Sequence, residues 1–318
     1  MKIVVLDGYA QNPGDLSWEE MNKLGELVLY DRTPTELILQ RASGAQVVIV
    51  NKVKMTRDII NNLADLRYIG VAATGFDVVD IVAASDRGIV VANVPAYSTD
   101  SVIQMVFSHL FELCINVKAH SDAVHRNEWT NSKDFCFWNY PLVEVAGKTM
   151  GIIGFGKIGQ KVALAAKAFG MKVIVFSRTK VENAGVPDVE WVSLEEVFSR
   201  SDVLTLHCPL NDSTKGIVNK DTLRLMKSSA FLINTARGGV IVEQDVADAL
   251  NTRVIAGAGI DVLSTEPPKE DNPMLTAKNC LITPHIGWAT YEARKRLMDI
   301  AVSNVKAFAL GKPENKVN

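Results

Sequence analysis

Short apolar runs alternate with segments of helical periodicity along the first hundred residues. Runs rich in β-branched residues predict strands, and segments with apolar residues three and four positions apart predict helices. We expect strands at residues 3–6, 27–30, 47–50, 68–72 and 89–91, and helices at 36–41, 56–63 and 78–86. Strands that alternate with helices in this way are typical of a parallel, doubly wound sheet.

The alternation breaks at residues 94–100 and then starts again. An apolar helix is expected from about 101 to 117, where the chain would cross into a second domain. Further strands are expected at 149–153, 172–176, 203–207, 230–234, 255–260 and 280–283, and a last helix at about 290–310. This last helix follows the complete second sheet, so we expect it to pack on the first domain.

The expected fold is therefore α/β with two doubly wound parallel-sheet domains. One domain comprises residues 1–98 plus 288–318, and the other comprises residues 99–287. Two crossings of the chain would leave a cleft between the domains, where ligands of such folds usually bind.

A glycine-rich motif stands between the first strand of the second series and the helix after it. Gly154 would permit a tight turn, Gly156 would let the backbone approach a pyrophosphate, and Gly159 would let helix and strand pack closely. The first turn of the helix, at Lys157 and Ile158, offers N–H donors to phosphate oxygens. A purely structural glycine turn is the alternative, but the flanking strand and helix favour a dinucleotide cofactor.

The end of the next strand distinguishes the two nicotinamide cofactors. An acidic residue there would bind the ribose 2′-hydroxyl of NAD, but the chain has Ser177, Arg178 and Thr179. A small residue followed by arginine can hold a 2′-phosphate, so we expect NADP(H) to be favoured, with NAD(H) as the alternative. An arginine that only stacks on adenine would suit either cofactor.

Composition argues against several other classes of protein. A formal charge of −2 gives no broad positive field for nucleic acid or an anionic membrane, and no apolar stretch approaches the roughly 20 residues that span a bilayer. The cysteines, at positions 114, 136, 208 and 280, form no close pair, which argues against a disulfide framework and a zinc site. We expect a cytoplasmic protein without a metal.

Three more segments place polar residues directly after predicted strands. They are residues 234–239, 257–268 and 283–287, and they contain Arg237, Glu266 and His285 respectively. Together with the glycine motif, and in this order, they resemble the D-isomer-specific 2-hydroxyacid dehydrogenase family over nearly the whole chain. The resemblance implies a Rossmann cofactor domain, a flavodoxin-like substrate domain, and transfer of a hydride between a nicotinamide cofactor and a 2-keto acid.

The resemblance further implies that Arg237, Glu266 and His285 form the active site. Reduction of a 2-keto acid needs a hydride, a proton for the forming alkoxide and a cation for the carboxylate. His285 would donate the proton, Glu266 would hydrogen-bond to His285 and fix its orientation, and Arg237 would bind the substrate oxygens.

Other contacts are implied by the same resemblance. Residues 73–77 are similar to the family loop whose backbone N–H groups receive the substrate carboxylate, so Thr74 and Gly75 are expected to bind substrate. Lys52 would add positive charge there, although an ordinary exposed lysine fits its position equally well. The remaining cofactor contacts are expected at Cys208, Pro209, Thr214, Thr235, Ala236, Arg237, Asp261, His285 and Gly287, with Asp261 at the nicotinamide carboxamide.

Residues 94–99 and 135–138 resemble the glycerate dehydrogenase and hydroxypyruvate reductase branch of the family. We therefore expect hydroxypyruvate and D-glycerate, or glyoxylate and glycolate, as substrates. Residues 129–140 contain five aromatic residues where the family has a dimerisation arm, so a homodimer is expected, with core packing as the alternative.

Two other functions stay open at this point. A cofactor-sensing protein without catalysis would have lost one of Arg237, Glu266 and His285, all of which are present. A dehydrogenase of the formate or phosphite type shares the fold and the cofactor, but typically departs from the pattern around the glutamate.

Overall fold

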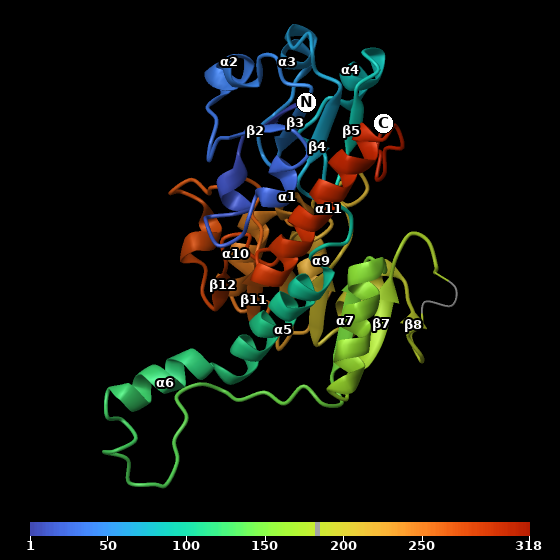
Figure 1. Ribbon diagram of the computed structural model, residues 1–318. Coiled ribbons are helices and arrows are strands. Elements are labelled where there is room, and N and C mark those ends of the chain that lie inside the picture. Colours follow the sequence, from blue (N-terminus) through green and yellow to red (C-terminus); the bar gives the residue numbers. More distant parts are fainter. Residues whose placement is uncertain (182–184) are drawn as a thin grey trace. The chain divides into compact units, whose positions relative to one another are not determined.

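The computed structural model describes residues 1–181 and 185–318, and the chain divides into two compact units. The terminal unit consists of Met1–Ser98 and Ala289–Asn318 (Figure 1, blue to teal, and red). The central unit consists of Thr99–Trp288 (Figure 1, green to orange). The second division falls one residue after the position expected from the sequence.

The sheet of the terminal unit has five parallel strands. They are β1 (Lys2–Val5), β2 (Glu26–Leu29), β3 (Val47–Val50), β4 (Tyr68–Val71) and β5 (Val90–Ala92). Their order is β2-β1-β3-β4-β5, which is the flavodoxin-like order, and the chain reverses direction across the sheet between β1 and β3. All residues of β3 and β4 are buried, because helices cover both faces, and the strands therefore read as continuous apolar runs.

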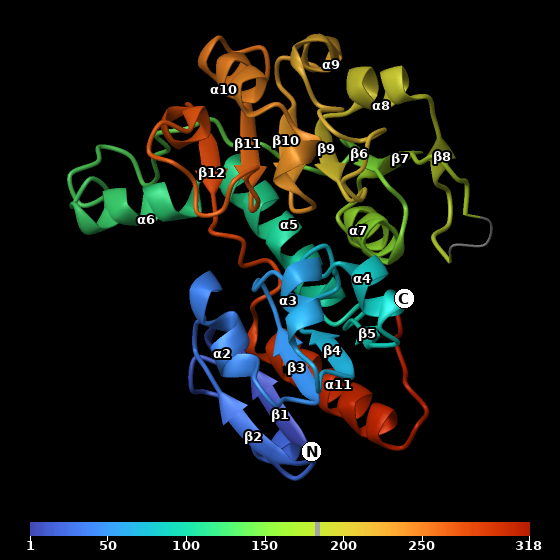
Figure 2. The ribbon, with the colours of Figure 1, turned by 90° about the horizontal axis from the view of Figure 1, so that it is seen from above.

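Helices from both ends of the chain cover this sheet. They are α1 (Glu19–Asn22), α2 (Ile38–Ala42), α3 (Arg57–Asn62), α4 (Ile81–Asp86) and α11 (Tyr291–Ala309), with 3-10 turns η1 (Gly8–Ala10) and η2 (Thr35–Leu37). The last helix, α11, packs on β4 (Figure 2). The ring centroid of Phe308 lies 4.8 Å from that of Tyr68. The final helix thus returns to the first sheet, as the order of elements predicts.

One expected helix is shorter than its pattern suggested. The apolar periodicity predicted a helix over 78–86, but α4 starts at Ile81, because the side chain of Asp80 accepts a hydrogen bond from Ala83 N and caps the first turn. The expected strand at 255–260 likewise begins only at Gly257.

The sheet of the central unit has seven parallel strands. They are β6 (Thr149–Ile153), β7 (Lys172–Phe176), β8 (Glu190–Trp191), β9 (Val203–Leu206), β10 (Phe231–Asn234), β11 (Gly257–Ile260) and β12 (Cys280–Ile282). Figure 2 shows them in the order β12-β11-β10-β9-β6-β7-β8, with the reversal between β6 and β9. This is the Rossmann order with one strand added. The strand β8 was not predicted, since two residues are too few to show a pattern.

Helices cover both faces of this second sheet. They are α5 (Thr99–Ile115), α6 (Val117–His125), α7 (Lys157–Ala168), α8 (Leu194–Arg200), α9 (Lys220–Leu225) and α10 (Glu243–Asn251), with 3-10 turns η3 (Gly238–Val240) and η4 (Pro273–Thr276). Residues of α5 and α7 share one buried cluster with the sheet, and residues of α8, α9 and α10 share another. A capping box formed by Ser193 and Glu196 opens α8.

The helix α6 differs from the other helices of the central unit. In Figures 1 and 2, α6 and the segment after it extend away from the sheet. Within the described part of the chain, no single helix is long and apolar enough to cross a membrane; α5 and α6 meet that test only as a pair, and a bend of 54° separates them.

Candidate active site

The predicted functional residues of the central unit follow the carboxyl ends of its strands. Gly154 follows β6, Cys208 follows β9 after one residue, Arg237 lies beyond β10, Glu266 beyond β11 and His285 beyond β12. Because all seven strands are parallel, these ends lie along one edge of the sheet. Ligands of open α/β sheets bind at this edge, beside the point where the strand order reverses.

The three glycines of the motif have three different environments. Gly154 has φ +93°, and a Cβ there would lie 2.6 Å from Cys208 N, so the turn excludes any side chain. A Cβ on Gly159 would lie 2.3 Å from Gly154 O, which explains the close packing of α7 on β6. A Cβ on Gly156 would meet no protein atom within 4 Å, so this position opens onto space in which a ligand fits.

Two further features of this edge fit a dinucleotide. Intrahelical bonding of α7 starts with Gln160 N donating to Gly156 O, so the N–H groups of Lys157 and Ile158 have no acceptor within the helix. Thr235 Oγ1, just after β10, is buried and has no hydrogen-bond partner among the residues described. A buried hydroxyl without a partner is costly, so a ligand that pairs with Thr235 gains affinity.

The segment expected to read the cofactor ribose lies next to the glycine turn. Gly154 N donates to Phe176 O, at 2.9 Å, which joins the glycine turn to the end of β7. Ser177 follows directly and is partly buried, whereas Arg178 and Thr179 are exposed. A hydroxyl and a cation therefore stand where an acidic residue would bind a ribose 2′-hydroxyl.

The end of β9 forms the next part of this edge. His207 lies densely surrounded by protein although part of its surface stays accessible, and this desolvation lowers the pKa of its imidazole to about 3. Its Nε2 lies 3.0 Å from Thr205 Oγ1. Burial also raises the pKa of the Cys208 thiol. Beyond it, Thr214 Oγ1 donates to Pro209 O at 2.6 Å and closes the turn that follows β9.

Glu266 and His285 are in direct contact. The distance from His285 Nδ1 to Glu266 Oε2 is 2.6 Å, and Leu263 N donates to Glu266 Oε1 at 3.0 Å. The backbone thus holds one carboxylate oxygen while the other accepts the Nδ1–H of the imidazole. This contact directs the second ring nitrogen, Nε2, away from Glu266. The side chain of His285 is 26% exposed, so a ligand can reach it.

The backbone of His285 adopts a left-handed conformation, with φ +54°. Such a conformation is uncommon for a residue other than glycine and persists when its surroundings fix it. Asp261, which is 2% exposed, provides that support. Its carbonyl accepts from His285 N at 2.8 Å, its Oδ1 from Ile286 N at 3.0 Å, and its Oδ2 from Gly287 N at 2.9 Å.

These hydrogen bonds limit which groups of Gly287 and Asp261, two predicted cofactor contacts, are left to bind a cofactor. The N–H of Gly287 is engaged by Asp261. The Asp261 carboxylate has about four acceptor positions, and the hydroxyl of Thr283 takes a third at 2.6 Å from Oδ1. One position remains, on Oδ2, for a donor such as a carboxamide.

Asn234, which was not among the predicted site residues, organises the loop that carries Arg237. Its buried side chain accepts from Ala236 N and donates to Arg237 O, both at 3.0 Å. Gly238 then passes so close to Leu263 that a Cβ would lie 1.9 Å from the Leu263 carbonyl carbon. The Arg237 loop and the loop leading to Glu266 are therefore in contact. The signal in the sequence was a single polar residue ending an apolar strand.

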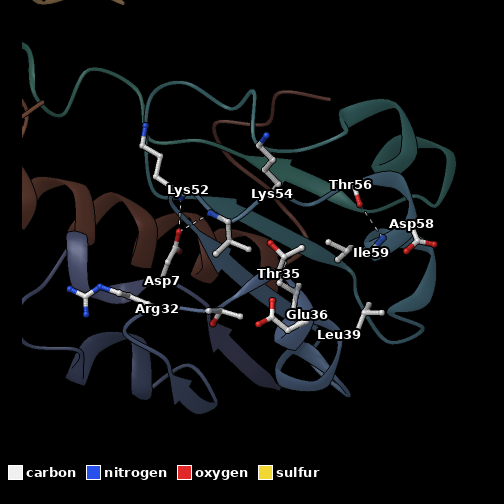
Figure 3. A pocket seen from close by; sticks show the side chains of 13 residues that line it. Asp7, Arg32, Thr35, Glu36, Leu39, Lys52, Lys54, Thr56, Asp58 and Ile59 are labelled. Carbon is white, nitrogen blue, oxygen red and sulfur yellow. Dashed lines mark hydrogen bonds between the residues drawn. The ribbon is translucent and has the colours of Figure 1, made fainter. Parts of the chain in front are cut away.

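Lys52 lies at the corresponding edge of the terminal unit. Asp7, which follows β1 after one residue, accepts hydrogen bonds from the backbone N–H groups of Asn51, Lys52 and Val53 at 2.7, 2.5 and 2.9 Å, and so fixes the loop after β3. Lys52 lines a pocket of about 750 Å³, and its side chain points to the same side as that of Lys54 (Figure 3). Asp7 was not among the predicted site residues, and its position directly after the expected strand 3–6 was the only signal in the sequence.

Thr74 and Gly75 follow the neighbouring strand, β4. Thr74 Oγ1 donates to Val94 O at 2.9 Å, and Asn93 Nδ2 donates to Thr74 O at 2.7 Å. Asn51 Nδ2 donates to Ala72 O at 2.6 Å. The loops after β3, β4 and β5 are thus tied together, and Lys52, Thr74 and Gly75 stand on a connected framework. Among the described residues, no cluster of three or more His, Cys, Asp or Glu side chains is arranged to hold a metal ion.

Comparison with known proteins gives a family match over the central unit. A family model described as "D-isomer specific 2-hydroxyacid dehydrogenase, NAD binding domain" matches residues 107–287, which is more than half of the chain. The match spans the glycine motif, Arg237, Glu266 and His285.

Similar proteins extend the match to both units. The chain is 50% identical to a hydroxypyruvate reductase of Blautia hydrogenotrophica, over 100% of both chains. It is 42% identical to a glycerate dehydrogenase of Methylorubrum extorquens, over 99% of this chain and 98% of that one. Among solved structures, an acyclic imino acid reductase in complex with NADPH and D-Arg is 32% identical and covers 100% of both chains with a TM-score of 0.87.

Proposed function

Because the chain belongs to the D-isomer specific 2-hydroxyacid dehydrogenase family, we propose that it interconverts hydroxypyruvate and D-glycerate with a nicotinamide cofactor. The observation that carries the chemistry is the 2.6 Å contact between His285 and Glu266, on the same sheet edge as the glycine turn. The two relatives named for hydroxypyruvate and glycerate support the choice of substrate. Glyoxylate, reduced to glycolate, is the expected second substrate.

The residues present can hold the cofactor at this edge. The N–H groups of Lys157 and Ile158 would bind its phosphates, and Gly156 leaves room for them. Thr235 and the remaining acceptor of Asp261 would bind polar groups nearer the reacting end, the latter a carboxamide N–H. The bound nicotinamide supplies the hydride.

His285 acts as the general acid in the direction of reduction. Its Nδ1–H stays on Glu266, so the proton that leaves is the one on Nε2, and it goes to the carbonyl oxygen of the substrate. In the direction of oxidation, Nε2 takes this proton back from the hydroxyl group. Glu266 does not exchange a proton with substrate; it holds the ring in one orientation.

Arg237 binds the substrate oxygens. A planar guanidinium can hold a carboxylate through two parallel hydrogen bonds, and it also stabilises the charge that develops on the carbonyl oxygen. Asn234 fixes the turn from which Arg237 projects.

In the terminal unit, which we propose as the substrate domain, the substrate carboxylate would meet the backbone at Thr74 and Gly75 and the charge of Lys52. The bonds that tie the loops after β3, β4 and β5 together support this proposal, because a preorganised loop loses less entropy on binding. The central unit is proposed as the cofactor domain.

For the cofactor we propose a preference for NADP(H) over NAD(H). The support is the chemistry of Ser177, Arg178 and Thr179 at the end of β7, where a hydroxyl and a guanidinium can bind a 2′-phosphate. We further place the enzyme in the cytoplasm, since its cysteines are unpaired thiols, as is typical of a reducing compartment.

We also propose a homodimer that uses α6 and the segment after it. Phe135 is 90% exposed and Trp138 is 63% exposed, and Trp129, Tyr140 and Leu142 are exposed as well. Large apolar side chains gathered on one surface segment mark protein interfaces, and aromatic residues are enriched in them. The exposure of these side chains supports an interface over core packing, the alternative interpretation.

The proposed function is tested by following cofactor absorbance near 340 nm with hydroxypyruvate, glyoxylate and pyruvate, each with NADPH and with NADH. We expect the highest kcat/KM for hydroxypyruvate and a product that a D-glycerate-specific assay recognises. Formation of L-glycerate would contradict the family chemistry. Cofactor binding without oxidation by any of the three acids would refute the substrate assignment and favour a sensor.

A further inference from the structure

A buried histidine of α5 lies behind the loop of His285. His109 is 4% exposed and stands in the apolar part of α5. Its ring packs on β11 at Gly259, where a Cβ would lie 2.6 Å from His109 Cβ, so only glycine lets the imidazole approach the strand this closely. Its Nε2 lies 3.1 Å from Thr283 Oγ1.

The direction of the hydrogen bonds in this group can be deduced. Thr283 Oγ1 has a single hydrogen, and Asp261 Oδ1, at 2.6 Å, is its strong acceptor; the other acceptor nearby, Met105 Sδ, is 3.8 Å away. The hydroxyl oxygen therefore has to accept from His109. This assigns the hydrogen of His109 to Nε2 and gives a chain from His109 through Thr283 to Asp261.

This series of hydrogen bonds ends on the backbone of His285. Asp261 accepts from the N–H groups of His285, Ile286 and Gly287, and these bonds hold the left-handed conformation at His285. Thr283 is also bonded to this segment, because His285 N lies 2.9 Å from Thr283 O. A donor that fixes the Thr283 hydroxyl fixes the orientation of the Asp261 carboxylate, and with it the position of the imidazole.

We propose that His109 is a positioning residue for His285 and acts through the hydroxyl of Thr283 and the carboxylate of Asp261. The proposal rests on the proposed role of His285 in proton transfer. A solvated or merely space-filling histidine would not need a hydrogen-bond donor at Nε2. The proposal therefore requires that a side chain with a donor at the same place can replace His109.

The test compares His109→Leu, which removes the donor, with His109→Gln, whose amide nitrogen can take the place of Nε2. Thr283→Val and Thr283→Ser form a second pair, without and with the hydroxyl. Leu113→Ala is the matched control. Leu113 lies one turn further along α5 and packs on Gly257 of the same strand, so this change weakens the packing between helix and sheet without touching the chain of hydrogen bonds.

Two quantities are measured on the full-length protein with folded fractions determined in parallel. The first is kcat and KM for hydroxypyruvate reduction. The second is hydrogen exchange at the amides of Ile286 and Gly287, relative to amides of β9. We expect His109→Leu and Thr283→Val to lower kcat about three- to tenfold and to speed exchange at these two amides by a similar factor. His109→Gln and Thr283→Ser should restore both quantities.

Leu113→Ala should lower the melting temperature while kcat of the folded enzyme and the relative exchange stay as in the wild type. If His109→Leu behaves like Leu113→Ala, or if His109→Gln is no better than His109→Leu, the positioning role is overturned. If the wild type reduces none of the 2-keto acids, the proposed function fails, whereas the exchange measurement still decides whether His109 fixes the His285 loop.

Discussion

His207 should make the stability of the central unit depend on pH. Its imidazole is desolvated, and its pKa is lowered to about 3 in the folded chain, while an unfolded histidine titrates near 6.5. The folded form thus binds fewer protons than the unfolded form between these two values. The free energy of unfolding is therefore highest above the unfolded pKa of about 6.5, as far as His207 is concerned, and it decreases as the pH falls below that value.

The magnitude follows from linkage. Between about pH 7.5 and pH 5 the unfolded imidazole gains a proton and the folded one does not, which lowers the free energy of unfolding by about 2 kcal/mol. The result hardly changes if the folded pKa is one unit higher, because the folded imidazole is still mostly neutral at pH 5. The loss is fixed mainly by protonation of the unfolded chain.

The assay compares the wild type with His207→Gln, which stays neutral and can keep a hydrogen bond to Thr205, by chemical denaturation at both pH values. Other groups that titrate contribute equally to both proteins, so they cancel in the difference. We expect the variant to lose about 2 kcal/mol less than the wild type on acidification. His125→Gln, at an exposed position of α6, is the control and should behave as the wild type. Equal pH dependence of His207→Gln and the wild type would refute the desolvation argument.

Three further predictions concern the cofactor site and the interface. Gly156→Ala should leave the melting temperature nearly unchanged, because its Cβ meets no protein atom, yet weaken cofactor binding at least about tenfold in a fluorescence titration. Gly154→Ala, whose Cβ clashes with Cys208 N, should lower the melting temperature and weaken cofactor binding as well. Equal behaviour of the two variants would contradict the geometry. Arg178→Ala should lower kcat/KM for NADPH about tenfold or more and that for NADH much less, and an equal loss for both cofactors would exclude recognition of a 2′-phosphate. Phe135→Asp should convert the proposed dimer to a monomer, as measured by light scattering, whereas Val82→Asp, at an exposed position of α4, should not. A monomeric wild type would contradict the proposed dimer interface.

The sequence predicted the parts of this molecule that depend on local pattern. Buried parallel strands are continuous apolar runs, so β3 and β6 were located to the residue, whereas the two residues of β8 carry no pattern. The glycine motif was recognised because each glycine answers a backbone requirement, and the contact between Glu266 and His285 was expected from the resemblance alone.

Residues that act by fixing the backbone were harder to predict. Asp7 and Asp261 each accept hydrogen bonds from loops distant in sequence, and no spacing rule shows which amide such a carboxylate will meet. The contact of His109 is equally hard to predict from sequence, because its partner Thr283 lies far along the chain. Such contacts exist only once the sheet has brought the ends of its strands together.

The central claim, that His285 transfers the proton in a nicotinamide-dependent reduction, is tested most directly by His285→Asn. Asparagine tolerates the left-handed backbone at this position but cannot act as a general acid near neutral pH. We predict that kcat for hydroxypyruvate falls about 100- to 10,000-fold, while the Kd of the cofactor, measured by fluorescence, stays within about fivefold of the wild type. A variant that binds the cofactor and keeps kcat within about twofold of the wild type would contradict the account.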